Sequence, residues 1–249
     1  MTVVKPEGHG PFPVVLQFHG CGGLFAMQFD YAEAARSAGV AVVIVDSFAP
    51  RGISRVEAQA TICTGIRLRG AERSRDVLAM LGWVEAQSWA DPSRIAVAGW
   101  SHGAWAVMEA LARPAPAALP ISSAILFYPY CGPLSGTLSR GWGVNRPRVY
   151  GVICGRDSVV GWTNPERTLR RLERDGLNVG VTFLPDASHG FDEEAPRAPP
   201  NRFRPQLAKA SHGWYAEALS ESLLAASGGP AIDARRDWMS PRTTQTART

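Results

Sequence analysis

The sequence has no uninterrupted run of about eighteen apolar residues, the length that a membrane-spanning helix requires. Residues 1–13 also lack the apolar core of a signal peptide. We therefore expect a cytoplasmic protein with no membrane contact. The net charge is only +4, and no basic stripe is interleaved with aromatic residues, so we expect no nucleic-acid partner.

Cysteine is scarce, and the cysteines that are present form no metal-binding pattern. Cys21, Cys63, Cys131 and Cys154 are widely spaced, and none belongs to a C-x-x-C pair. We expect neither a metal nor an organic cofactor. Free cysteines in a reducing compartment are the favoured interpretation. A Cys21–Cys63 or a Cys131–Cys154 disulfide remains an alternative if the protein is exported.

The composition is that of an ordinary globular protein, because 45% of the 249 residues are hydrophobic and 19% are charged. This length allows one sizeable core, and neither an internal repeat nor a second domain is visible. We predict a single domain over residues 1–226 and a disordered tail over residues 227–249. A monomer and a homodimer are both compatible with the sequence.

Six short apolar runs alternate with helical patterns along the chain, which predicts an α/β fold with a mostly parallel sheet and helices on both faces. Polar residues follow four of these runs directly, namely His19, Ser101, Asp157 and His189. In such sheets the site lies beyond the carboxyl ends of the strands. The predicted strands are residues 14–18, 40–45, 94–98, 122–128, 149–154 and 179–184, and the predicted helices are 27–38, 70–89, 104–112, 164–175 and 207–226.

Residues 99–103 read Gly-Trp-Ser-His-Gly between a predicted strand and a predicted helix. In that context G-x-S-x-G is typical of a nucleophile elbow, in which the serine adopts a strained conformation at the tip of a tight turn. The strand and the helix then approach so closely that a β-carbon two residues before or after the serine would clash. Gly99 and Gly103 fill those positions. We predict that Ser101 is the nucleophile.

A serine hydroxyl needs a base within hydrogen-bond reach, and the base needs a third group to orient it. We predict His189, after the last strand, as the base and Asp157, after the preceding strand, as the orienting acid. The chain order Ser101, Asp157, His189 is the order of α/β-hydrolases. Asp186 and Asp192 are alternatives for the acid, although we expect them to shape the histidine loop instead.

Two hydrogen-bond donors are needed for the oxyanion of a tetrahedral intermediate. We predict the backbone N–H of His102 as one, since it opens the elbow helix while its side chain points away from Ser101. The second is the N–H of Cys21, in a glycine-rich loop at residues 19–23 that allows close approach. A phosphate-binding loop is the alternative for these residues, but the lysine of a P-loop is missing.

From residue 3 to about residue 226, the chain resembles an α/β-hydrolase of the dienelactone-hydrolase-like family. The resemblance rests on residues 19–23, 46–52, 91–95, 99–103, 155–157 and 188–191. It implies an esterase with a catalytic triad and an oxyanion hole, acting on a small-molecule ester or lactone. Two departures are visible. Ser101 stands where the naming members of the family have a cysteine, which favours a serine esterase over their lactone substrate. The usual first strands of the superfamily are missing or truncated.

The substrate is only outlined by the sequence. Residues 129–147 are too few for a large helical lid, which favours a small and fairly open acyl site. Arginines bind a substrate carboxylate in the family that the chain resembles, so Arg51, with Arg55, suggests an acidic ester or lactone, although solvated loop arginines are the alternative. Three tryptophans could form an apolar wall of the pocket or could pack in the core, namely Trp100, Trp142 and Trp162.

Two other functions are compatible with the same residues. A Ser-His-Asp triad also serves amide or peptide hydrolysis in relatives of prolyl oligopeptidase, although the propeller domain that gates those enzymes is absent from this sequence. An α/β-hydrolase scaffold can also be a catalytically silent binding protein. Such a protein would have lost a triad residue or an oxyanion glycine, and this chain retains them.

Overall fold

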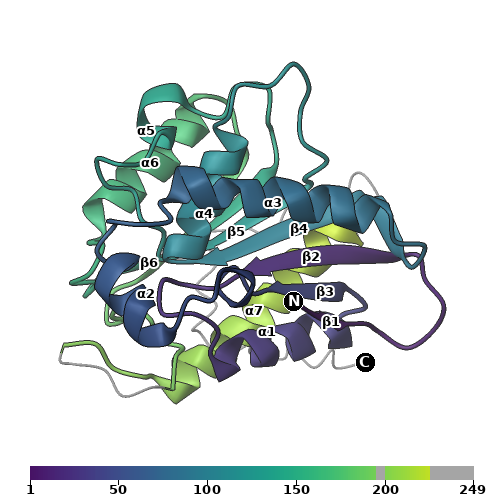
Figure 1. Cartoon of the computed structure of the whole chain (residues 1–249), viewed down its shortest axis with the longest axis horizontal. Helices are drawn as coiled ribbons and strands as arrows, with labels where there is room; N and C mark the ends of the chain where they lie inside the picture. Colours follow the sequence, from purple (N-terminus) through teal and green to yellow (C-terminus); the bar gives the residue numbers. More distant parts are fainter. Residues whose placement is uncertain (195–199, 225–249) are drawn as a thin grey trace, which may run out of the picture.

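A seven-stranded sheet organises the computed structural model, which describes residues 1–194 and 200–224 (Figure 1). The strand order is β1-β3-β2-β4-β5-β6-β7, and every neighbouring pair is parallel except β1 and β3. The predicted tail at residues 227–249 lies outside the described residues. The strands are β1 (Thr2–Val4), β2 (Phe12–Phe18), β3 (Ala41–Val45), β4 (Ala90–Trp100), β5 (Ser123–Phe127), β6 (Arg148–Cys154) and β7 (Val179–Leu184).

Helices cover both faces of this sheet, as the alternation of strands and helices predicts (Figure 1). Two apolar clusters, one on each face, join α3, α4 and α6 on one side and α1 and α7 on the other. The helices are α1 (Ala26–Ser37), the short 3-10 helix η1 (Ala49–Arg51), α2 (Arg55–Thr61), α3 (Gly70–Glu85), α4 (His102–Leu111), α5 (Thr137–Arg140), α6 (Thr163–Arg174) and α7 (Pro205–Leu223).

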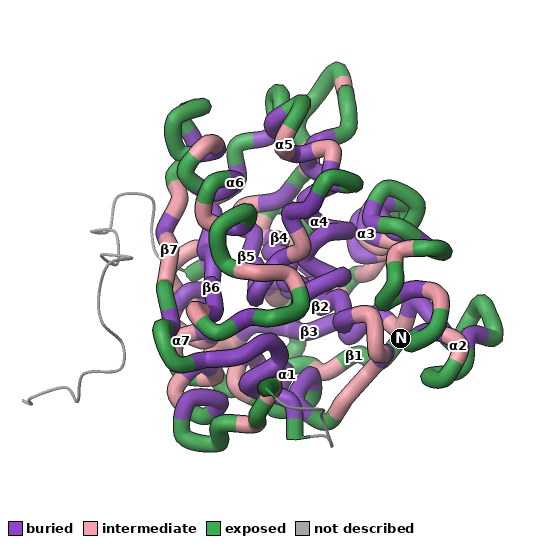
Figure 2. Tube along the Cα trace, turned by 90° about the vertical axis from the view of Figure 1, so that its left-hand side faces the viewer, coloured by how far each residue is buried: buried purple, intermediate pink, exposed green. Residues whose placement is uncertain are grey.

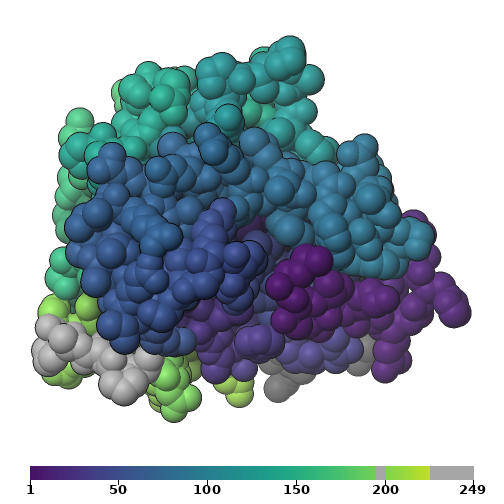
Figure 3. Space-filling model, in the orientation of Figure 1, coloured from purple at the N-terminus to yellow at the C-terminus, as the bar shows by residue number. Residues whose placement is uncertain are grey.

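The central strands β2 to β6 are largely buried on both faces, which explains why they read as continuous apolar runs rather than alternating ones (Figure 2). Successive side chains of β2 show this directly. Leu16 and Phe18 pack with the cluster of α3 and α4, whereas Val15 packs with the cluster of α1 and α7. In the same orientation as Figure 1, Figure 3 shows the blue atoms of the region around α2 and α3 at the surface of the molecule.

The structure corrects the sequence-based assignment in three places. The short edge strand β1 pairs with β3 and was not predicted, since three residues carry too little pattern. Residues 55–61 lie outside the predicted helices but form α2, which Ser54 caps by accepting a hydrogen bond from the N–H of Glu57. Residues 91–93 lie outside the predicted strands but belong to an irregular part of β4, in which Asp91 accepts a hydrogen bond from the N–H of Ser93.

Between β5 and β6, the one helix that the structure describes is the four-residue α5. This agrees with the prediction that residues 129–147 hold no large helical lid. Within the described part of the chain, no helix is both long and apolar enough to cross a membrane.

Candidate active site

Ser101 lies at the sharp turn between β4 and α4, with a φ of 53° and a ψ of −111°. A residue other than glycine rarely adopts this backbone conformation, and close packing of β4 against α4 and β2 holds Ser101 in it. A β-carbon on Gly99 would lie 2.4 Å from the backbone nitrogen of Ala104, and one on Gly103 would lie 2.0 Å from the carbonyl oxygen of Phe18. Both glycines are therefore required sterically, for the reason that the sequence suggested.

The side chains of Ser101, His189 and Asp157 form one hydrogen-bonded chain. The Nε2 atom of His189 is 2.9 Å from Oγ of Ser101, and its Nδ1 atom is 2.7 Å from Oδ2 of Asp157. The other oxygen of Asp157 accepts hydrogen bonds of 2.9 Å from the N–H groups of Val159 and Val160. All three side chains are buried, so the carboxylate is held in one orientation beside the ring.

Tyr128, which the sequence reasoning did not single out, packs against the catalytic candidate His189 with 4.7 Å between ring centroids. Its hydroxyl donates to Asp192 at 2.7 Å, and Tyr31 donates to the other oxygen at 2.9 Å. Burial raises the pKa of Asp192. The signal that could have found Tyr128 is its place, since it follows β5 directly at the carboxyl edge of the sheet.

The two other aspartates near the histidine do not contact its ring. Asp192 is occupied by the two tyrosines, and Asp186 is exposed and pairs with Arg156. Among the three candidate carboxylates, Asp157 is the one that meets His189. That Asp186 and Asp192 shape the histidine loop stays a prediction.

Cys21 and His102 flank Ser101 and lie on the same cavity. Neither backbone N–H has a hydrogen-bond acceptor among the described residues. The loop at residues 19–23 comes close to the nucleophile: a β-carbon on Gly20 would lie only 3.8 Å from Cβ of Ser101. The ring of His102 turns toward Arg73, whose Nη1 atom is 3.1 Å from its Nδ1. Burial, with the positive charge of Arg73, lowers the pKa of His102 to about 3, so its ring is neutral.

A cavity of about 130 Å³ opens beside Ser101. A disulfide between Cys21 and Cys63 forms part of its wall. Apolar side chains make up most of the remainder, namely Ile62, Trp105, Tyr130, Leu134, Val159 and Val160. Sequence reasoning missed Trp105 and Tyr130, although Trp105 lies one helical turn beyond Ser101.

The expectation of four free cysteines is wrong for two of them. Cys21 and Cys63 are bonded, with 5.1 Å between their Cα atoms, whereas Cys131 and Cys154 are free and buried. This pairing was one of the alternatives left open by the sequence. The sequence alone could not select it, because 42 residues separate the two cysteines. A disulfide is more typical of an oxidising compartment than of the cytoplasm, and the cytoplasmic location stays a prediction.

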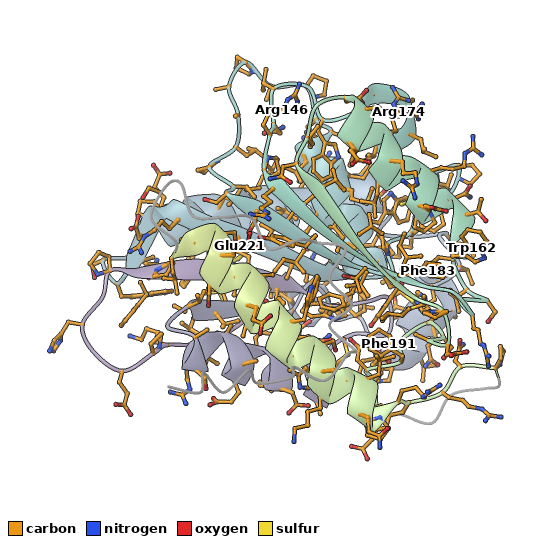
Figure 4. The ribbon with its side chains drawn as sticks, turned by 180° about the vertical axis from the view of Figure 1, so that it is seen from behind. Arg146, Trp162, Arg174, Phe183, Phe191 and Glu221 are labelled. Atoms are coloured by element: carbon orange, nitrogen blue, oxygen red, sulfur yellow. A yellow bond between two sulfur atoms is a disulfide. The ribbon has the colours of Figure 1, made fainter. Side chains whose placement is uncertain are left out.

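Trp100 and Trp142 are core residues and not part of the cavity wall. Trp100 is fully buried and stacks on Phe127, because its side chain leaves β4 on the face covered by α1 and α7. Trp142 is 2% exposed and packs in the opposite cluster. Trp162 is 41% exposed and lies edge-on against Phe183 of β7, at the edge of the sheet (Figure 4). It does not line the cavity either.

The arginines predicted to bind substrate form hydrogen bonds with other parts of the protein. The guanidinium of Arg51 forms two hydrogen bonds with Asp76, at 2.7 and 3.0 Å, and a third with the carbonyl of Ser47. Arg55 donates to the carbonyl of Leu24. Among the described residues, neither lines the cavity beside Ser101, so their contact with a substrate carboxylate stays a prediction that the geometry does not support. In the described part of the chain, no group of three or more His, Cys, Asp or Glu side chains is placed to hold a metal ion.

The sequence matches the model of a known protein family. The model of the dienelactone hydrolase family matches residues 1–220. The chain belongs to this family. As a member of the dienelactone hydrolase family it is a carboxylic ester hydrolase, built on the α/β-hydrolase fold. No curated protein matches the sequence.

Solved structures share the fold at low sequence identity. A dienelactone hydrolase-like promiscuous phosphotriesterase from metagenomic libraries has a TM-score of 0.71 and 21% identity, over 88% of this chain and 91% of that chain. Esterase 2 of Thermogutta terrifontis with bound propionate has a TM-score of 0.62 and 15% identity, over 92% and 90%. The same esterase phosphorylated by paraoxon has a TM-score of 0.63 and 19% identity, over 90% of each chain. At these identities the likeness shows the fold alone.

Proposed function

We propose that the protein hydrolyses short-chain, uncharged carboxylic esters through an acyl-enzyme on Ser101. One observation carries the proposal. The imidazole of His189 bridges Oγ of Ser101 and Oδ2 of Asp157 at 2.9 and 2.7 Å. Asp157 accepts from Nδ1–H, which leaves Nε2 free to take the serine proton. This is the arrangement that turns a weakly nucleophilic hydroxyl into an effective one.

In the first step, Oγ of Ser101 bonds to the ester carbonyl carbon while its proton moves to Nε2 of His189. The carbonyl oxygen becomes negatively charged, and the N–H groups of Cys21 and His102 donate hydrogen bonds to it. Asp157 stabilises the imidazolium that has formed. His189 then returns the proton to the alcohol oxygen as the carbon–oxygen bond breaks, and the acyl group stays on Ser101.

In the second step, a water molecule attacks the acyl-enzyme. His189 takes a proton from the water as its oxygen bonds to the acyl carbon, and a second oxyanion forms between the same two N–H groups. Collapse of this intermediate breaks the bond to Oγ of Ser101, which regains its proton from His189. The products are a carboxylic acid and an alcohol, and no external reductant, oxidant or metal enters the balance.

The size and polarity of the cavity support one class of substrate. Its volume of about 130 Å³ is below the roughly 300 Å³ at which pockets for drug-sized ligands begin. Most of the described residues in its wall are apolar, and none of them is an arginine or a lysine. These features favour acyl groups of a few carbons without a charge. The bound propionate of the Thermogutta terrifontis esterase is an acid of that class.

The test is hydrolysis of para-nitrophenyl esters from acetate to octanoate by the wild type and by Ser101→Ala. We expect turnover that decreases with chain length and is lost in the variant. Paraoxon, which phosphorylates the Thermogutta terrifontis esterase, should inactivate the wild type by adding one diethylphosphoryl group to Ser101. A folded wild type that is inert toward all the esters and toward paraoxon would refute the proposal. Activity on para-nitroanilides alone would point to the amidase alternative.

A further inference from the structure

Arg73 is a fully buried cation on α3 that has no carboxylate within ion-pair distance among the described residues. Its Nη2 atom also has no hydrogen-bond partner in that part of the chain. Burying an arginine without a carboxylate is costly, and an apolar side chain would fill the same space at lower cost. A role in stability therefore does not explain this residue.

The partners of Arg73 all belong to segments around the oxyanion site. Its Nη1 atom donates to the carbonyl of His19 at 2.8 Å and to Nδ1 of His102 at 3.1 Å. Its Nε atom donates to Oγ of Ser47 at 3.0 Å. One guanidinium nitrogen thus joins the loop that carries Cys21 to the first residue of α4. These are the two segments that supply the oxyanion donors in the proposed mechanism.

His19 extends this network to the peptide of Cys21. Its Nε2 atom accepts a hydrogen bond from the N–H of Ser47 at 3.2 Å, so its Nδ1 carries the proton and donates to the carbonyl of Gly20 at 2.7 Å. In a trans peptide the carbonyl and the following N–H point in opposite directions. Holding the carbonyl of Gly20 on the side of His19 therefore turns the N–H of Cys21 to the opposite side.

We propose that Arg73 is a positioning residue for the oxyanion hole, which fixes the separation and direction of the Cys21 and His102 N–H groups through His19, Ser47 and the His102 ring. This inference rests on the proposed function. The guanidinium also places a positive charge behind both donors, where it favours the developing oxyanion. Burial lowers the pKa of Arg73 to about 9, so the side chain is still charged at neutral pH.

The experiment compares Arg73→Met and Arg73→Lys with Arg75→Met, a matched control on the exposed face of the same helix. For para-nitrophenyl acetate we expect kcat of Arg73→Met to fall about 10- to 100-fold with KM within about twofold, somewhat less than the loss of a whole oxyanion donor. Arg73→Lys keeps the positive charge but not the fork of donors, so its kcat should lie between those of Arg73→Met and the wild type. Arg75→Met should match the wild type.

Two readouts separate positioning from a structural role. The inhibition constant of a trifluoromethyl ketone, whose adduct places an oxyanion between the donors, should rise in parallel with the fall in kcat. Amide hydrogen exchange should accelerate at residues 19–23 but not in β4 or β5. If kcat and inhibitor affinity of a folded Arg73→Met stay within about threefold of the wild type, or if exchange accelerates throughout the sheet, the inference is wrong.

Failure of the proposed function has a different signature. In that case the wild type itself hydrolyses none of the esters and does not bind the ketone. The exchange measurement then still decides whether Arg73 holds the loop, since it requires no activity. Unchanged exchange at residues 19–23 in Arg73→Met, or in Arg73→Lys if the methionine variant does not fold, would overturn the inference on its own.

Discussion

Cys21 and Cys63 are joined by a disulfide in the wall of the cavity beside Ser101, and Cys21 also carries one of the two proposed oxyanion donors. The bond fastens the loop after β2 to the segment after α2, across 42 residues of sequence. It therefore fixes one side of the acyl site, and it cross-links a large part of the N-terminal half of the chain.

Replacing Cys63 by serine should lower stability and raise KM. For a closed loop of this length, chain entropy predicts a loss of about 4 kcal/mol in the free energy of unfolding. We also expect KM for para-nitrophenyl butyrate to rise, because the cavity wall loses its anchor. Urea unfolding and steady-state kinetics measure the two effects. The wild type treated with dithiothreitol should behave like Cys63→Ser, and the variant itself should not respond to the reductant. Equal stability with and without the bond would contradict this prediction.

The assignment of Asp157 as the orienting acid can be separated from its neighbours by a matched pair of variants. Asp157→Asn should reduce kcat by about 10,000-fold, because an amide stabilises the wrong tautomer of the His189 ring. Asp186→Asn should leave kcat unchanged, since Asp186 is exposed and pairs with Arg156. Both are measured with para-nitrophenyl acetate after circular dichroism has shown that the variants fold. A comparable loss in both variants would mean that the acid is not assigned correctly.

Replacing Arg51 by alanine should affect neutral and carboxylate-bearing esters equally. Its guanidinium is held by Asp76 and the carbonyl of Ser47, and it does not line the cavity. We expect a small loss of stability, of about 1 kcal/mol or less, from the partly exposed ion pair. The ratio of KM values for a neutral ester and its monoacid counterpart measures the effect. A selective rise in KM for the monoacid would restore the carboxylate-binding role that the sequence suggested.

Two buried histidines beside the oxyanion loop predict a loss of stability in mild acid. Burial, with the positive charge of Arg73, lowers the pKa of His102 to about 3 and that of His19 well below the ordinary 6.5. Below that ordinary value the unfolded chain binds protons that the folded protein excludes, so stability falls with decreasing pH. At pH 5 His102 alone should cost about 2 kcal/mol relative to pH 8.

Asp192 has the opposite dependence, because its raised pKa means that the folded protein holds a proton that the unfolded chain releases. Its contribution to stability is lost as the pH rises through the folded pKa, which is the opposite sign to the histidine effect. Urea unfolding at pH 5 and pH 8 measures the sum. In His102→Gln, whose amide oxygen can still accept from Arg73, the difference between the two pH values should shrink by about 2 kcal/mol. An unchanged difference would show that His102 does not titrate as described.

The catalytic candidates and the sheet could be predicted from the sequence because their signals are local. Six strands were visible as apolar runs, since burial on both faces of the central strands favours apolar side chains at nearly every position. Ser101 follows such a run directly, and Asp157 and His189 lie in the loops that come after two others. The glycines around Ser101 are required by contacts within one strand–turn–helix unit. A pattern that is complete within a few residues can be read without knowing the rest of the fold.

Only the tertiary structure decided which side chains surround the reacting atoms. The sequence could not pair Cys21 with Cys63, bury Trp100 against Phe127 or turn Arg73 toward His19 and His102. Each of these contacts joins segments that are far apart in the chain. Their geometry depends on how α3, the loop after β2 and the segment after α2 pack over the same edge of the sheet, and no local pattern encodes that packing.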